Sequence, residues 1–137
     1  MSSYERWIDW WEEALDDLAT AKDLLKLHRY SKACFFSHQA CEKALKALMI
    51  KEMNRYELIH SVAELLKRLN KVLSVPEGLI RKGEILDKFY IPTRYPNTWP
   101  YGAPYKHFTG EDAELAIKCA EEVIKFVKGV IERKSTK

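Results

Sequence analysis

A long and almost entirely apolar stretch, residues 31–49 (SKACFFSHQACEKALKALM), constrains the fold most strongly. Apolar side chains recur there at helical spacing and form a broad arc, which leaves only a narrow polar stripe. A helix with so little polar surface has to be surrounded by other helices, so the pattern predicts a central position in a helical bundle. The polar side chains that remain in it stand out as candidates for function: His38, Gln39, Glu42, Lys43 and Lys46.

The length and composition are those of an ordinary globular chain. The 137 residues, 31% charged and 47% apolar, predict one domain spanning residues 1–137. No apolar run approaches the roughly 20 residues that a membrane span needs, and the first residues lack the apolar region of a secretory signal. We therefore expect a cytoplasmic protein without a membrane partner.

The cysteines and the charge exclude several classes of protein. Cys34, Cys41 and Cys119 are odd in number, lie in apolar helical patterns and form no CxxC pair, so we expect buried thiols, and no metal or cofactor. A net charge of +3, from 23 basic and 20 acidic residues, is too small to indicate nucleic acid by itself. Basic residues are frequent between Lys43 and Lys88, where an RNA partner would approach.

The periodicity predicts an all-α fold, an antiparallel helical bundle. One long loop, rich in proline and aromatic residues, precedes the last helix. The expected helices are residues 4–27, 30–52, 60–73, 77–89 and 110–133. In the first of them, Ile8, Leu15 and Leu18 are among the apolar side chains expected to face the core. Thr109, with Asp112 three residues later, predicts a capped start for the last helix.

The long loop, residues 91–110 (IPTRYPNTWPYGAPYKHFTG), holds four of the five prolines. Because proline restricts the backbone, we expect this loop to be ordered. Arg94 is its best candidate for a functional contact, and its alternative role is to bond loop carbonyls. The loop aromatics either stack on bases or cover the bundle core: Tyr95, Trp99, Tyr101 and Tyr105.

Four segments, in this order and spacing, resemble the HEPN family of small helical domains. They are FFSHQACEKALKAL (35–48), IHSVAELL (59–66), FYIPTRYPN (89–97) and the alanine-rich helix that follows residue 109. The resemblance implies an antiparallel up-and-down bundle of four to five helices that usually forms a homodimer. It also implies a toxin–antitoxin-like pair in which a minimal nucleotidyltransferase is often the partner. Many members of the family are thought to be metal-independent ribonucleases.

The ribonuclease motif of the family is an arginine, four to six residues, and then a histidine. Arg94 stands where the family's arginine usually falls, but residues 99–101 are Trp, Pro and Tyr. The next histidine is His107, with twelve residues between it and that arginine, so the motif is not intact there. A second match, Arg55 and His60 with four residues between them, lies elsewhere in the chain, between two helices.

Residues and resemblance together give a set of predicted site residues. For catalysis they are Arg94 and His107, since an arginine stabilises phosphate charge and a histidine transfers protons near neutral pH. For nucleotide or RNA binding they are Arg94, Tyr95, His38, Lys43 and Lys46. The alternative for His38 is a buried contact with another helix, and for the two lysines a solvated or interface edge.

Three functions remain open at this point. The chain is a nucleotide- or RNA-binding half of a nucleotidyltransferase/HEPN pair, a non-catalytic interaction module for a nucleotidyltransferase, or a metal-independent ribonuclease.

Overall fold

The computed structural model describes residues 5–135. Its helices are α1 (Arg6–Lys26), α2 (Tyr30–Met53), α3 (Val62–Leu69), α4 (Leu79–Asp87) and α5 (Gly110–Ser135), with two 3₁₀ turns, η1 (Pro96–Thr98) and η2 (Pro104–His107), in the long loop. No strand occurs in this part of the chain. The predicted all-α bundle, with its proline-containing loop before the last helix, is confirmed.

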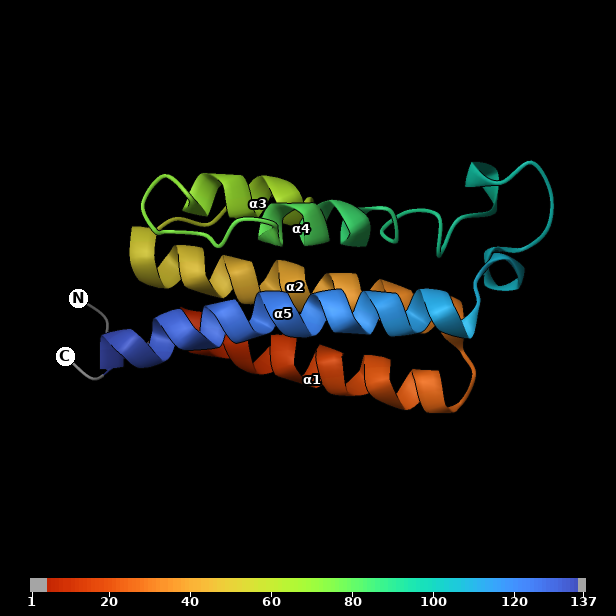
Figure 1. Ribbon diagram of the computed structural model, residues 1–137, viewed down its shortest axis with the longest axis horizontal. Helices are drawn as coiled ribbons and strands as arrows, with labels where there is room; N and C mark the ends of the chain where they lie inside the picture. Colours follow the sequence, from red (N-terminus) through yellow and green to blue (C-terminus); the bar gives the residue numbers. More distant parts are fainter. Residues whose placement is uncertain (1–4, 136–137) are drawn as a thin grey trace.

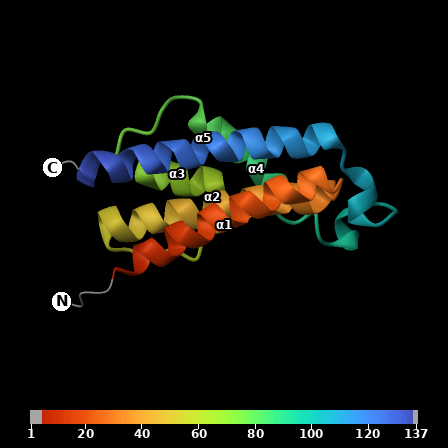
Figure 2. The same cartoon turned by 90° about the horizontal axis from the view of Figure 1, so that it is seen from below.

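Helix α2 lies at the centre of the bundle. It contacts α1, α3, α4, α5 and η2, as its broad apolar arc predicts. In Figure 1, α1 lies below the layer formed by α2 and α5, and the short helices α3 and α4 lie above it. Figure 2 gives the view from below, with α1 nearest the viewer and α5 running antiparallel to it. The turns η1 and η2 project at one end, opposite the chain termini.

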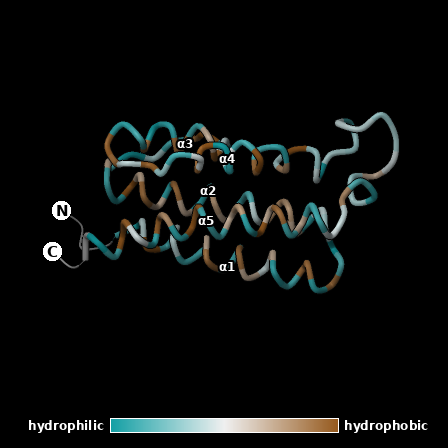
Figure 3. The backbone as a smooth tube through the Cα atoms, viewed as in Figure 1, coloured by the Kyte–Doolittle hydropathy of each residue, from teal (hydrophilic) through white to brown (hydrophobic). Residues whose placement is uncertain are grey.

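The inward face of α1 differs from the prediction. Ile8 and Leu15 are 39% and 41% exposed, whereas Ala14, Leu18 and Ala21 are buried. The small alanine side chains allow α1 to approach α2 closely, so the helix turns its alanine face inward and leaves two larger side chains at the surface. Brown and teal alternate along α1 and α5 in Figure 3, as expected for helices that bury one face.

Two helices are shorter than the sequence pattern predicted. Helix α4 begins only after Gly78, whose φ of +90° is outside the helical range. Helix α3 ends at Leu69 instead of continuing to residue 73, because the side chain of Asn70 accepts a hydrogen bond from the Val75 amide at 3.0 Å and closes a turn. The expected start of the first helix, Tyr4, lies outside the described residues.

Local capping fixes the starts of α3 and α5. The Ser61 hydroxyl accepts a hydrogen bond from the Glu64 amide at 3.0 Å. At α5, Thr109 and Asp112 exchange bonds between amide and side chain at 2.9 and 3.2 Å, which confirms the predicted cap.

The core contains all three cysteines as free, buried thiols, as predicted. Within residues 5–135, no helix combines the length and apolar character that crossing a membrane requires.

Candidate functional site

Arg94 lies in the turn that follows α4, and two hydrogen bonds hold the backbone of this turn. The hydroxyl of the fully buried Thr93 donates to the Phe89 carbonyl at 2.7 Å. The indole N–H of Trp99 donates to the Pro92 carbonyl, also at 2.7 Å. These bonds attach the turn to the end of α4 and to the loop, so the backbone at Arg94 is fixed in position.

The guanidinium of Arg94 lies among three aromatic rings. Its central carbon is 4.4 Å from the ring centre of Phe35 and 4.8 Å from those of Tyr90 and Tyr95. Its Nε donates to the Tyr90 carbonyl at 3.1 Å, and a terminal nitrogen donates to the Tyr95 hydroxyl at 3.4 Å. No carboxylate within residues 5–135 forms an ion pair with this guanidinium. The half-buried positive charge of Arg94 is thus left without an anion in the part of the chain that the structure describes.

His60 packs on one of the same rings. Its ring centre lies 5.2 Å from that of Tyr90, with the planes 18° apart. Its Nδ1 is 3.2 Å from Oε2 of Glu42, and the side chain is 56% exposed. Because the carboxylate accepts the proton on Nδ1, Nε2 is left as the nitrogen that can accept a proton. We call the following residues the Arg94 surface: Phe35, His60, Tyr90, Arg94 and Tyr95.

Below this surface, His38 and Asp87 join three helices. His38 is fully buried, and its Nε2 lies 3.1 Å from Oδ1 of Asp87. The same carboxylate accepts bonds from the Ser61 hydroxyl at 2.7 Å and from the amides of Val62 and Ala63 at 2.7 and 3.2 Å. Burial acts to raise the pKa of Asp87, but these hydrogen bonds outweigh it, and the pKa is lowered. The carboxylate therefore ties the end of α4 to α2 and to the first turn of α3.

A buried ion pair lies further along α2. Lys46 donates to Oε2 of Glu42 at 2.8 Å, and both side chains are almost completely buried. The ammonium is also 5.9 Å from the ring centre of Trp10 and 5.5 Å from that of Tyr56. Oε1 of Glu42 has no hydrogen-bond partner among the described residues. Glu42 thus holds Lys46 and His60 with a single oxygen.

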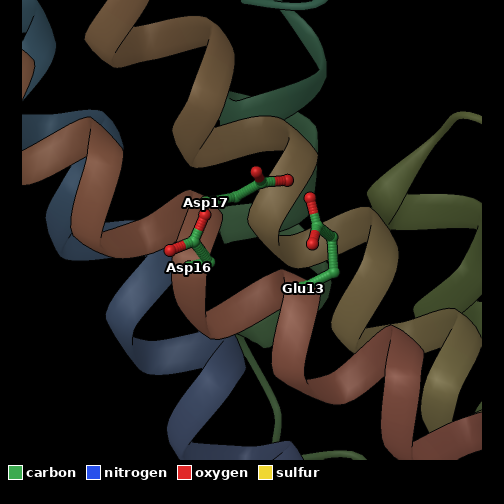
Figure 4. Close-up of side chains that lie close together, drawn as sticks. All are labelled: Glu13, Asp16 and Asp17. Atoms are coloured by element: carbon green, nitrogen blue, oxygen red, sulfur yellow. The ribbon is translucent and has the colours of Figure 1, made fainter.

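Lys43 faces α1 and lies beside acidic side chains. Its ammonium is 2.7 Å from Asp17 and 3.9 Å from Glu13. Figure 4 shows these two carboxylates and that of Asp16 on α1, where oxygens of all three lie within 4.8 Å of one another. Lys43 already supplies a cation to this group, in which Asp17 is buried while Glu13 and Asp16 are exposed.

His107 belongs to a separate arrangement at the end of the long loop. Its ring stacks on Trp99, with centres 3.9 Å apart and planes 3° apart. Its Nε2 donates to the Tyr101 carbonyl at 2.8 Å. In the part of the chain that the structure describes, no hydrogen bond, ion pair or ring contact joins His107 to Arg94.

The structure brings some of the predicted site residues together and separates others. Arg94 and Tyr95 share the Arg94 surface. His38 lies beneath it, Lys46 lies further along α2, and Lys43 is on the side of α2 that faces α1. A role for the last three in binding stays a prediction.

Sequence reasoning missed three members of this region. It interpreted His60 as a helix-start residue and gave no role to Tyr90 or Asp87. The only local signal was the numerical match of Arg55 with His60, but Arg55 pairs with Glu57 at 3.7 Å and makes no contact with His60 among residues 5–135. The relevant neighbours of His60 come from other helices, which no short motif reveals.

Comparison with known proteins identifies the family. The HEPN domain profile matches residues 7–130, nearly the whole chain. The chain belongs to the HEPN family.

The relatives of this HEPN protein match nearly its whole length. It is 30% identical over 133 residues, covering 90% of this chain and 86% of the relative, to the protein named "Putative toxin MJ1304" from Methanocaldococcus jannaschii. Among solved structures it resembles TT1696 from Thermus thermophilus, with a TM-score of 0.88 and 39% identity over 92% of this chain and 98% of the other.

Two further solved structures carry the HEPN name. ST0689, an archaeal HEPN homologue, superposes with a TM-score of 0.76 at 34% identity, covering 93% of this chain and 99% of the other. An HEPN domain protein from Thermotoga maritima gives 0.73 at 32% identity, covering 91% and 98%. The resemblance inferred from the sequence is confirmed.

Proposed function

We propose that this HEPN protein is the toxin-like member of a two-component pair and that it binds RNA at the Arg94 surface. The relative named a toxin supports the first part. The second part rests on one observation. The Arg94 guanidinium pairs with no carboxylate among residues 5–135 and lies among aromatic rings, of which Tyr95 is 51% exposed.

These groups match the two parts of a single-stranded nucleotide. A guanidinium presents several N–H donors to phosphate oxygens and keeps its charge at every accessible pH. An exposed tyrosine ring offers a face on which a base can stack, independently of the base identity. RNA held in this way has its phosphate on Arg94 and a neighbouring base on Tyr95.

Fluorescence anisotropy with a labelled single-stranded RNA tests this proposal. Arg94→Ala is expected to weaken binding about tenfold, and Tyr95→Ala by a similar factor, since a phosphate contact or a stacked base each contribute about 1–3 kcal/mol. Arg94→Lys keeps the charge but loses the planar contact with the rings, so its affinity is expected to fall between those of the wild type and Arg94→Ala.

The matched control is Arg81→Ala, which removes an exposed arginine from α4, away from the aromatic rings. It is expected to change the affinity less than about twofold. Equal losses in Arg81→Ala and Arg94→Ala would mean that RNA responds only to net charge, and the proposed surface would be wrong.

The toxin of the proposed pair is a homodimer of this chain, and the antitoxin is a minimal nucleotidyltransferase. Light scattering after size exclusion is expected to give about twice the chain mass of 16.1 kDa. Co-expression with a nucleotidyltransferase encoded beside it is expected to give a stable complex. If the complex forms while the free protein binds no RNA, the interaction module is the better description.

Metal-independent RNA cleavage is a second candidate, favoured by the position of His60 beside Arg94. Both side chains pack on Tyr90, and Glu42 orients the imidazole. Nε2 of His60 would take the proton of a ribose 2′-hydroxyl as its oxygen attacks phosphorus, while Arg94 stabilises the charge on the phosphorane. The bond between phosphorus and the 5′-oxygen then breaks, the 5′-oxygen takes a proton from solvent water, and a 2′,3′-cyclic phosphate remains.

Cleavage of a labelled RNA in the presence of EDTA tests this candidate. His60→Gln is expected to lower the rate about 100-fold, in the usual range for losing a general base. His28→Gln, which alters an exposed histidine in the turn between α1 and α2, is the control and is expected to leave the rate unchanged. A wild-type protein that binds RNA without cutting it refutes the ribonuclease function and leaves the binding proposal standing.

A further inference from the structure

The outer side of α1 combines exposed apolar side chains with exposed carboxylates. Helix α1 packs against α2 and α5, and Figure 2 shows that no other element covers its outer side. Ile8 and Leu15, which are 39% and 41% exposed, lie on this side. Glu12, Asp16 and Asp23 are exposed beside them. We call these five residues the α1 outer face.

The spacing on the α1 outer face is typical of a helix that pairs with another helix. Ile8 and Leu15 are seven residues apart, and so are Asp16 and Asp23. In paired helices, apolar residues at this interval form the seam between the helices, and charged residues beside the seam determine which partner fits. The pattern extends over residues 8–23, a length of about 23 Å at the rise of an α-helix.

The carboxylates of the α1 outer face have no cation of their own. Among residues 5–135, Glu12, Asp16 and Asp23 form no ion pair and no side-chain hydrogen bond. Carboxylate oxygens of Asp16, Glu13 and Asp17 lie within 4.8 Å of one another, so like charges are held together on this helix (Figure 4). A cation brought to the α1 outer face would therefore relieve repulsion as well as form new ion pairs.

The sign of the charge excludes several occupants. Residues 5–26 contain seven acidic and three basic residues, although the whole chain carries a net charge of +3. RNA and anionic lipid would be repelled by this helix. A second copy that docked through the same face would place its carboxylates against these carboxylates, because both sides of a two-fold contact are identical. The remaining occupant is a protein segment that is apolar along its seam and basic beside it.

We infer that the α1 outer face docks an amphipathic helix of a partner protein, with lysine or arginine on both sides of its apolar seam. The seam packs on Ile8 and Leu15, and the basic side chains pair with Glu12, Asp16 and Asp23. Because both the apolar area and the charges are exposed in the free chain, the two helices can associate without rearrangement of the bundle.

This inference does not depend on RNA binding at the Arg94 surface. In Figure 1, α1 lies on the opposite side of the α2 and α5 layer from α4, which precedes the turn that carries Arg94. It also does not depend on the partner being a nucleotidyltransferase, since only the charge and the seam of the docked helix are specified.

Nuclear magnetic resonance of the ¹⁵N-labelled protein, titrated with a synthetic helix, tests this inference. The peptide has about 18 residues, enough to cover the face, with leucine along its seam and lysine on both sides. We expect saturable binding, with shifts in amide resonances centred on α1. A peptide with glutamate in place of every lysine, and a scrambled peptide of the original composition, are expected not to bind. Binding of the scrambled peptide, shifts centred on another helix, or no binding at all overturns the inference.

Reversal of two charges shows which residues select the docked helix. Glu12→Lys with Asp16→Lys is expected to weaken binding of the lysine peptide by about tenfold or more and to permit binding of the glutamate peptide. The matched control, Glu77→Lys with Glu84→Lys, reverses two exposed carboxylates at the start of α4 and within it. It is expected to change the affinity for the lysine peptide by less than about twofold. An equal loss in both double variants would mean that the peptide responds only to net charge, and the inference would be wrong.

A change in the seam separates docking of a partner from contact between copies of this chain. Leu15→Ser is expected to weaken binding of the lysine peptide about fivefold, because it removes exposed apolar surface. Val72→Ser, at a side chain that is 57% exposed outside α1, is expected to leave the affinity unchanged. Both variants should keep the wild-type mass in light scattering; a lower mass for Leu15→Ser alone would show that a second copy covers the face. Arg94→Ala is expected to bind the lysine peptide like the wild type, so this inference and the RNA proposal can fail separately.

Discussion

Nε2 of His38, in the middle of α2, lies 3.1 Å from Oδ1 of Asp87, the last residue of α4. The two residues are 49 positions apart in sequence. Through this contact a buried histidine on the central helix and a carboxylate that caps α3 become one hydrogen-bonded unit below the Arg94 surface.

Replacing Asp87 should destabilise the protein strongly. Asp87→Asn removes the charge that accepts bonds from the start of α3 and from His38, and we expect a loss of about 2–4 kcal/mol in the free energy of unfolding. Urea denaturation at pH 7 measures this loss. Glu84→Gln, which alters an exposed carboxylate on the same helix, is the control and is expected to change stability by less than about 0.5 kcal/mol.

The effect of Asp87 on stability should depend on pH. Its pKa in the folded protein is lowered, so the carboxylate stabilises the fold above the pKa of the unfolded chain, about 4. That stabilisation disappears as the pH falls through the lower, folded value. The difference in the free energy of unfolding between the wild type and Asp87→Asn should therefore become smaller when urea denaturation is repeated at pH 3. If this difference is the same at pH 7 and at pH 3, the lowered pKa of Asp87 is contradicted.

Replacement of two helical glycines by alanine should change the stability of the protein in opposite directions. A Cβ at Gly83 would lie 2.9 Å from the Ala63 amide nitrogen and 3.0 Å from its Cα, so α3 and α4 would have to separate. We expect Gly83→Ala to lower the free energy of unfolding by about 1–3 kcal/mol. A Cβ at Gly129 would have no atom within 4 Å. Gly129→Ala is therefore expected to raise the free energy of unfolding by about 0.5–1 kcal/mol. Thermal denaturation of both variants decides this; a stabilised Gly83→Ala would rule out the tight contact.

The three cysteines should be unreactive in the folded protein. Burial, with the nearby charge of Asp112, raises the pKa of Cys34 to about 12, and burial also raises the pKa of Cys41 and Cys119. Thiolate is the reactive form, so iodoacetamide at pH 8 is expected to label none of them within an hour. Mass spectrometry should find three labels per chain once denaturant is added. Rapid labelling without denaturant would indicate that the core opens.

The buried pair of Glu42 and Lys46 should show strong coupling. Lys46→Met leaves Glu42 with only His60, and Glu42→Gln leaves a buried ammonium without its anion. Each single change is expected to cost about 3–5 kcal/mol. The double variant should cost less than the sum of the two, by at least about 1 kcal/mol, because it leaves no unpaired charge. Additive effects in a urea-based double-mutant cycle would show that the pair does not interact.

The central helix could be predicted from sequence because its information is local. The apolar arc of residues 31–49 and the pairing of Thr109 with Asp112 are each contained in one segment. The inward face of α1 could not be predicted in the same way. Hydropathy ranks Ile8 and Leu15 above Ala14 and Ala21, whereas close approach to α2 favours the smaller side chains.

The residues of the candidate site divide in the same way, into those that one sequence segment identifies and those that only tertiary structure brings together. Arg94 and Tyr95 are neighbours in the chain, and the loop segment FYIPTRYPN (89–97) was enough to propose both of them as site residues. His60 and Asp87 matter because of what other helices bring next to them, and each reads as an ordinary helix-end residue in isolation. The separation of His107 from Arg94 follows from its stacking on Trp99, which also depends on tertiary structure.

The turn that carries Arg94 is anchored by the buried Thr93 and by the bond from Trp99. A side chain presented from such an anchored backbone is already ordered before any ligand arrives, so little conformational freedom is lost on association. Encounter with a ligand should then proceed in a single kinetic phase at a rate set by diffusion and charge, and differences in affinity among ligands should come mainly from how long each one stays.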